Sequence, residues 1–111
     1  MRICFDLDET LCTKESLGYE SCKPLPEASF LLKSLRSQGH KIIIYTARGM
    51  ESFKGSVGAA MSSIGLLTLN QLKEWDFEYD EIYFGKPSAD LYVDDKGQSA
   101  LEFWENYWSK E

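Results

Sequence analysis

The stretch RICFDLDET, residues 2–10, decides the fold, because a short apolar run there ends in closely spaced acids. Residues 2–7 are mostly apolar, which predicts a buried strand. Asp6 and Asp8 stand two residues apart, so in extended backbone their side chains point to the same side. Because two carboxylates at that spacing repel each other, we expect a metal ion or a basic side chain to lie between them.

Strands alternate with helices along the rest of the chain. Residues 11–23 predict a loop or a small hairpin, since they are of mixed polarity and precede two prolines. Apolar β-branched runs and helical spacing of apolar residues predict further elements: strands at 41–46, 81–84 and 90–93, and helices at 28–38, 51–64, 68–75 and 99–108.

This alternation predicts a single α/β domain over residues 1–111. The expected architecture is a Rossmann-like three-layer αβα sandwich around a central, mainly parallel sheet. No internal repeat, low-complexity run or linker divides the chain. In open sheets of this kind the active crevice lies at the carboxyl ends of the strands, so functional residues are sought there.

Composition narrows the class of protein. Hydrophobic residues make up 43% and charged residues 27% of the chain, as in ordinary globular proteins. The net charge of −6, from 12 basic and 18 acidic residues, argues against a nucleic-acid partner, which a basic face normally marks. No run approaches the roughly 20 apolar residues that span a bilayer, and no signal peptide precedes the first acids. A cytoplasmic protein without a membrane partner is expected.

The three cysteines favour a core role. An odd number in a reducing compartment argues against a disulfide framework, and Cys4 lies in the first predicted strand as a small core residue. Cys12 and Cys22 could flank a hairpin and, with His40, suggest a zinc site. Their spacing matches no standard metal pattern and no fourth ligand is evident, so the core interpretation is preferred.

Polar side chains follow each of the four predicted strands. In chain order these are Asp6, Asp8 and Thr10 after the first, Thr46 and Arg48 after the second, Lys86 after the third, and Asp94 and Asp95 after the fourth. Several carboxylates beside one lysine and one threonine make a hard-oxygen site, for which Mg²⁺ is the natural ion. Such a site suits phosphoryl transfer, which depends on positioning and electrostatics.

The residue types divide the chemistry among them. Asp6 can attack phosphorus and form an aspartyl-phosphate, and Asp8 can protonate the leaving oxygen and later deprotonate the hydrolytic water. Thr46 and Lys86 can bind the phosphoryl group. Arg48 has two interpretations: it reaches the phosphate or the leaving group, or it pairs with an acid such as Glu51.

The motifs DLDET, IIIYTAR, GKP and YVDD, in this order, resemble those of the haloacid dehalogenase (HAD) superfamily of phosphatases. The resemblance implies a HAD-like fold, with Asp6 as nucleophile and Mg²⁺ ligand and Asp8 as acid/base whose backbone carbonyl also binds the metal. It further implies that Asp94 or Asp95 completes the metal shell. Glu9 stands where many members have glycine.

The same resemblance extends to the capless branch of the superfamily. No segment is long enough for a large cap domain, and the stretch TARGMESFKG is similar to small bacterial proteins of capsule or polysaccharide biosynthesis. A phosphatase acting on a phosphorylated sugar or related metabolite is therefore expected. The alternatives are a phosphatase of a phosphoprotein or nucleic-acid end and a non-catalytic phosphate- or metal-binding regulatory module. An open site is compatible with a homo-oligomer or a partner subunit acting as its lid.

Overall fold

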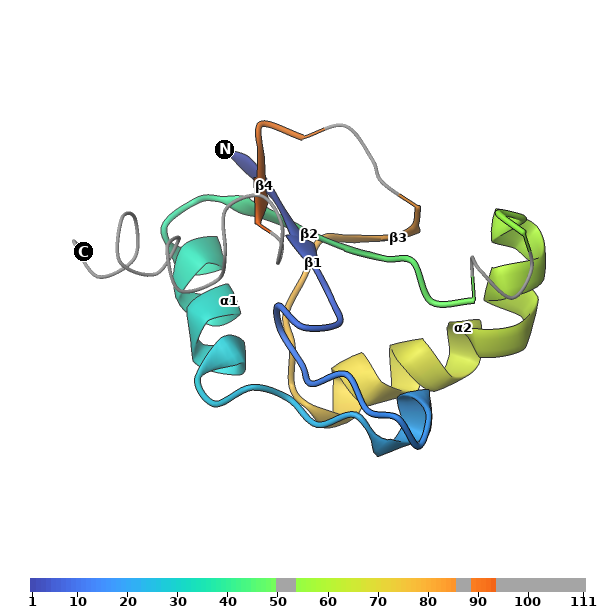
Figure 1. The fold of residues 1–111 in the computed structure, drawn as a ribbon. Coiled ribbons are helices and arrows are strands. Elements are labelled where there is room, and N and C mark those ends of the chain that lie inside the picture. Colours follow the sequence, from blue (N-terminus) through green and yellow to red (C-terminus); the bar gives the residue numbers. More distant parts are fainter. Residues whose placement is uncertain (50–53, 86–88, 94–111) are drawn as a thin grey trace.

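The computed structural model describes residues 1–49, 54–85 and 89–93, and the helix predicted at 99–108 lies outside them. Figure 1 shows a central sheet accompanied by two helices. The strands are all parallel and lie in the order β3-β2-β1-β4. The prediction of a Rossmann-like α/β fold around a parallel sheet is thus confirmed. The elements are β1 (Arg2–Asp6), the 3-10 helix η1 (Tyr19–Ser21), α1 (Ala28–Ser37), β2 (Lys41–Thr46), α2 (Val57–Glu74), β3 (Glu81–Phe84) and β4 (Leu91–Val93).

The core lies between one face of the sheet and the helices. Ile3 and Phe5 of β1 stand in register with Ile42 and Ile44 of β2, so alternate residues of the two central strands point to one face. Leucines of α1 and Leu72 of α2 pack into the same buried cluster. Residues of the opposite face are buried as well, Cys4 among them, as its core interpretation predicts. Burial on both faces explains why these strands are continuous apolar runs.

Helix α1 follows the prediction to within one residue at its C-terminal end. Its inner face carries Leu31, Leu32 and Leu35, whereas Phe30 is 61% exposed and points away from the core. Gly39 follows the helix with φ +93°, a left-handed conformation that glycine adopts without the steric cost of a side chain. The chain can therefore turn sharply from α1 into β2.

Helix α2 corrects the sequence prediction, which placed two helices at 51–64 and 68–75. A single helix runs through this region, because no proline interrupts it and Gly65, which could have ended the first helix, is instead buried in the helix interior. It begins after Ser56, whose side chain accepts a hydrogen bond from the Ala59 backbone N–H and caps the helix. The predicted start at residue 51 lies outside the described residues.

The segment between β1 and α1 forms the small hairpin-like flap that the sequence allowed. Thr13 N–H donates to the Lys23 carbonyl, and Leu25 N–H donates to the Leu11 carbonyl. The flap then carries η1 toward the C-terminal half of α2 (Figure 1). Within the described part of the chain, no helix is both long and apolar enough to cross a membrane.

Candidate active site

The carboxyl end of the sheet brings two predicted site residues together. Asp6 ends β1 and Thr46 ends the neighbouring β2, where Asp6 stands in register with Tyr45. One oxygen of the Asp6 carboxylate accepts a hydrogen bond of 2.9 Å from the Leu7 backbone N–H, which fixes the side chain over its own turn. Lys86, Asp94 and Asp95 follow β3 and β4 in the sequence and lie outside the described residues.

A tight turn after β1 positions Asp8. The buried Leu7 supplies the carbonyl oxygen on which the N–H groups of Thr10, Leu11 and Cys12 converge. Glu9 occupies the left-handed region with φ +69° and donates its N–H to the Cys12 carbonyl. Glycine adopts this conformation most easily, which explains why glycine is common at this position in the superfamily that the motifs resemble.

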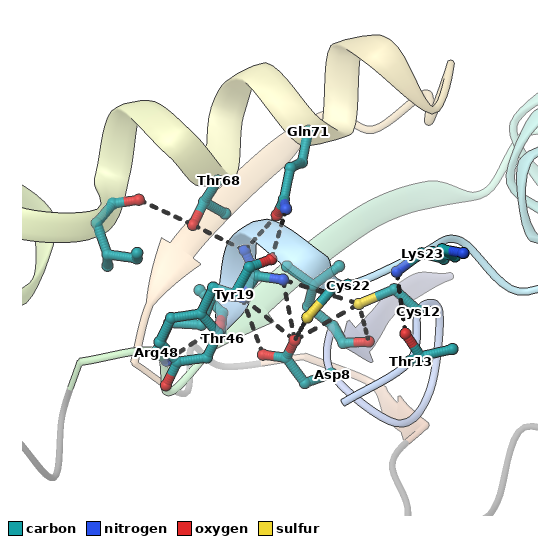
Figure 2. Close-up of polar contacts among 12 residues, drawn as sticks. Asp8, Cys12, Thr13, Tyr19, Cys22, Lys23, Thr46, Arg48, Thr68 and Gln71 are labelled. Atoms are coloured by element: carbon teal, nitrogen blue, oxygen red, sulfur yellow. Dashed lines mark hydrogen bonds and ion pairs between the residues drawn. The ribbon is translucent and has the colours of Figure 1, made fainter. Parts of the chain in front are cut away.

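Arg48 holds the Asp8 carboxylate in a forked ion pair (Figure 2). Arg48 Nε lies 3.2 and 3.1 Å from the two Asp8 oxygens, and Nη2 lies 2.9 Å from Oδ1. The Arg48 side chain is 0% exposed and that of Asp8 18% exposed. Burial acts to lower the pKa of Arg48, but the hydrogen bonds and charge of Asp8 raise it above its ordinary value. The guanidinium is therefore charged, and it fixes the orientation of Asp8.

Three further residues hold Arg48, and sequence reasoning missed all of them. Arg48 Nη1 donates to Thr68 Oγ1 at 3.2 Å and to Gln71 Oε1 at 2.5 Å, and the guanidinium lies 4.8 Å from the centre of the Tyr19 ring. Gln71 Nε2 in turn donates to the Tyr19 carbonyl at 2.7 Å, linking α2 to η1. The available signal was that Thr68 and Gln71 are polar residues three apart, so that they lie on one face of a helix.

Arg48 is thus paired with an acid, one of its two sequence interpretations, and the acid is Asp8. Thr46 is fully buried, and its hydroxyl accepts a hydrogen bond of 3.1 Å from the Arg48 backbone N–H. The hydroxyl of Thr46 therefore shapes the turn that delivers Arg48 to Asp8. Because the acceptor is a side chain, replacing Thr46 would remove this hydrogen bond at the end of β2.

The donor set after β1 fits a hard cation such as Mg²⁺, which binds carboxylate and carbonyl oxygens. Asp6 offers a carboxylate at the strand end. Within the described residues, no backbone N–H donates to the Asp8 carbonyl oxygen, which leaves it available as a ligand. The Asp8 carboxylate is engaged by Arg48, so the backbone carbonyl is the oxygen that Asp8 offers to this hard cation.

The hydroxyl of Thr10 is a buried polar group without a hydrogen-bond partner in the described structure. An unsatisfied buried hydroxyl costs stability, so the Thr10→Val variant should raise the free energy of unfolding by about 1 kcal/mol. Urea unfolding of the two proteins measures this difference. Thr68→Val is the matched control: its hydroxyl accepts from Arg48 and donates to the Ile64 carbonyl, so its loss should lower stability. A Thr10→Val protein that is clearly less stable would show that this hydroxyl has a partner.

Comparison with known proteins places the fold and the family. No protein-family profile and no curated protein sequence matches the chain. A D,D-heptose 1,7-bisphosphate phosphatase from B. bronchiseptica, crystallised with magnesium and phosphate, is 15% identical with a TM-score of 0.52 over 81% of this chain and 52% of its own. A chain of the Pnkp1/Rnl/Hen1 complex is 16% identical with a TM-score of 0.61, over 96% and 42% of the two chains.

The parallel sheet and these neighbours define a Rossmann-like α/β fold, which the chain shares with the heptose bisphosphate phosphatase. A structural-genomics target from Vibrio cholerae is more similar in sequence: it is 30% identical with a TM-score of 0.69, and the match covers 99% of this chain and 93% of the other. The chain belongs to one family with this Vibrio cholerae protein.

Proposed function

We propose that the protein is a Mg²⁺-dependent phosphomonoester hydrolase that acts through an aspartyl-phosphate on Asp6. The observation that carries the proposal is the pair of acids after β1, with Asp6 at the strand end and Asp8 held separately by Arg48. The two carboxylates have different surroundings, which suits two different tasks. The HAD-like fold and the phosphatase among its structural neighbours support this assignment.

The reaction divides into two steps on these residues. A carboxylate oxygen of Asp6 attacks phosphorus and the bond to the leaving oxygen breaks, while Asp8, which has first taken up a proton from solvent, gives that proton to the leaving oxygen. Asp8 then takes a proton from the water that attacks the aspartyl-phosphate, which releases inorganic phosphate and restores Asp6. Bound Mg²⁺ would supply charge neutralisation for the phosphoryl oxygens, held by Asp6, the Asp8 carbonyl and Asp94 or Asp95. Thr46 and Lys86 would bind the phosphoryl group.

The substrate proposed first is a phosphorylated sugar or a related metabolite, for example in capsule or polysaccharide biosynthesis. A neighbour that acts on a heptose bisphosphate favours this class. In the described residues only the small flap lies between β1 and α1, so we place the protein in the capless branch. A macromolecular phosphate is the second candidate, favoured by the likeness to a chain of an RNA repair complex and opposed by the net charge of −6.

The test is hydrolysis of p-nitrophenyl phosphate with added Mg²⁺ and with EDTA. We expect activity with Mg²⁺ and its loss with EDTA, because the phosphoryl charge then lacks its counter-ion. A screen of sugar phosphates, a phosphopeptide and a 3′-phosphorylated oligonucleotide would then separate the substrate classes. Equal activity in EDTA would contradict the metal dependence. A protein that binds beryllofluoride and Mg²⁺ but hydrolyses no substrate would instead be a regulatory module.

A further inference from the structure

Two thiols and a carboxylate converge beside the candidate active site. Cys12 Sγ lies 3.5 Å and Cys22 Sγ 3.9 Å from the same oxygen, Asp8 Oδ1. The three donor atoms all lie within 4.8 Å of one another. Figure 2 shows both sulfur atoms pointing toward Asp8 from the flap. His40, which sequence reasoning grouped with these cysteines, lies instead beside the amino group of Met1.

The flap brings the thiols together for a structural reason. Cys12 follows the turn that carries Asp8, and it forms an isolated bridge with Pro24 on the returning strand of the flap. Cys22 directly follows η1, just before that return. Both thiols are free and buried. Their positions are set by the backbone hydrogen bonds of the flap.

The two sulfur–oxygen separations are close to those between ligands of a tetrahedral zinc ion. Zinc binds thiolate sulfur at about 2.3 Å and carboxylate oxygen at about 2.0–2.2 Å, so neighbouring ligand atoms lie about 3.5–3.8 Å apart. The two measured sulfur–oxygen separations, 3.5 and 3.9 Å, are close to this range. Three protein ligands and one water are a common zinc environment, and the partly exposed Asp8 side chain gives an ion a way in.

We propose that Asp8, Cys12 and Cys22 form a binding site for a thiophilic divalent cation of the zinc type, whose occupation inhibits the enzyme. The inhibition rests on the proposed function, because the cation would withdraw the Asp8 carboxylate from proton transfer. The site differs in chemistry from the hard-oxygen donor set of Asp6 and the Asp8 carbonyl, which suits Mg²⁺. One residue therefore joins a magnesium-type and a zinc-type site.

The charges of the site balance with Arg48 still in place. On binding, each thiol loses its proton to water, so two thiolates and one carboxylate surround a doubly charged ion. The remaining negative charge is neutralised by Arg48, which already donates to both Asp8 oxygens. A hydrogen-bond donor behind a metal-ligating carboxylate fixes its orientation and supports binding.

The site is tested first by binding, in the full chain and with a phosphine reductant present. Titration with Co²⁺ should produce thiolate-to-metal charge-transfer absorption, which Zn²⁺ should then abolish by displacement. Cys12→Ser and Cys22→Ser should weaken binding by at least about tenfold, since loss of a supporting group alone costs 10- to 100-fold. Cys4→Ala is the matched control: Cys4 is buried in β1 outside the cluster, and its variant should bind as the wild type does.

Inhibition is measured separately. Zn²⁺ added at constant Mg²⁺ should reduce hydrolysis by the wild type and by Cys4→Ala, each relative to its own rate without Zn²⁺, and should reduce that of Cys22→Ser much less. Charge-transfer absorption that persists in both serine variants would overturn the site. Zn²⁺ inhibition that is equal in Cys22→Ser would overturn the regulatory role. Because the absorption needs no substrate, it decides the site even if the phosphatase assignment fails.

Discussion

Replacement of Asp6 by asparagine should abolish phosphomonoester hydrolysis while leaving the fold intact. An amide does not attack phosphorus as a carboxylate does, and loss of a covalent nucleophile in other hydrolases lowers kcat by up to about 10⁶-fold. We expect a fall of at least about 10⁴-fold for Asp6→Asn. The fold should survive because the amide oxygen can still accept the hydrogen bond from the Leu7 N–H. Steady-state kinetics with p-nitrophenyl phosphate and Mg²⁺ measure the effect.

Asp76→Asn is the matched control for this substitution. Asp76 makes an ion pair with Lys33 on the surface, between the end of α2 and the start of β3, and its side chain is 72% exposed. This variant undergoes the same chemical change and should keep its activity. Circular dichroism and the urea midpoint should be unchanged in both. Near-normal turnover by Asp6→Asn would remove Asp6 as the nucleophile.

Replacement of Arg48 by methionine should lower the free energy of unfolding by about 3 kcal/mol. The change removes the cation and leaves the Asp8 carboxylate, only 18% exposed, without its forked partner. Breaking a buried ion pair from one side typically costs about 3–5 kcal/mol, because the remaining charge has lost its compensation. Thr68 and Gln71 also lose the donor that binds both of them. Urea unfolding followed by circular dichroism measures the difference.

Two comparisons make the Arg48 prediction specific. Arg36 is also an ion-paired arginine, but its partners Glu78 and Asp80 lie on the surface. Arg36→Met should therefore change the urea midpoint far less than Arg48→Met does. The double variant Arg48→Met with Asp8→Leu should be more stable than the sum of the single changes predicts, because it removes both charges together. If Arg48→Met changed the urea midpoint as little as Arg36→Met, the ion pair of Arg48 with Asp8 would contribute little to stability.

Much of the fold could be predicted from the sequence, because the central strands are buried on both faces and therefore uniformly apolar. The run KIIIYT is one such strand, and the leucine spacing of 28–38 indicates a helix directly. The predicted break between helices at 51–64 and 68–75 was wrong, since local patterns mark helix ends poorly where no proline occurs. Spacing alone does not say which apolar residues of this helix face the sheet, and Phe30 is one that does not.

The candidate site was predictable only for residues that directly follow a predicted strand. Asp6 and Thr46 end adjacent strands, and the parallel order brings strand ends together. The pairing of Arg48 with Asp8 joins residues 40 positions apart, and only the flap and α2 determine that the guanidinium is enclosed. The convergence of Cys12 and Cys22 on Asp8 depends on the flap in the same way. No spacing rule in the sequence carries that information.

The enclosure of Arg48 has a consequence for how relatives of this protein vary. Arg48 follows β2, and its guanidinium joins that strand end to three other segments, represented by Asp8, Tyr19 and Gln71. The Gln71 amide faces both Arg48 and the Tyr19 carbonyl. A relative that replaces the arginine would leave the Gln71 amide oxygen and the Asp8 carboxylate without their charged donor. Substitutions at positions 8, 48 and 71 are therefore expected to occur together across an alignment, as one inherited unit.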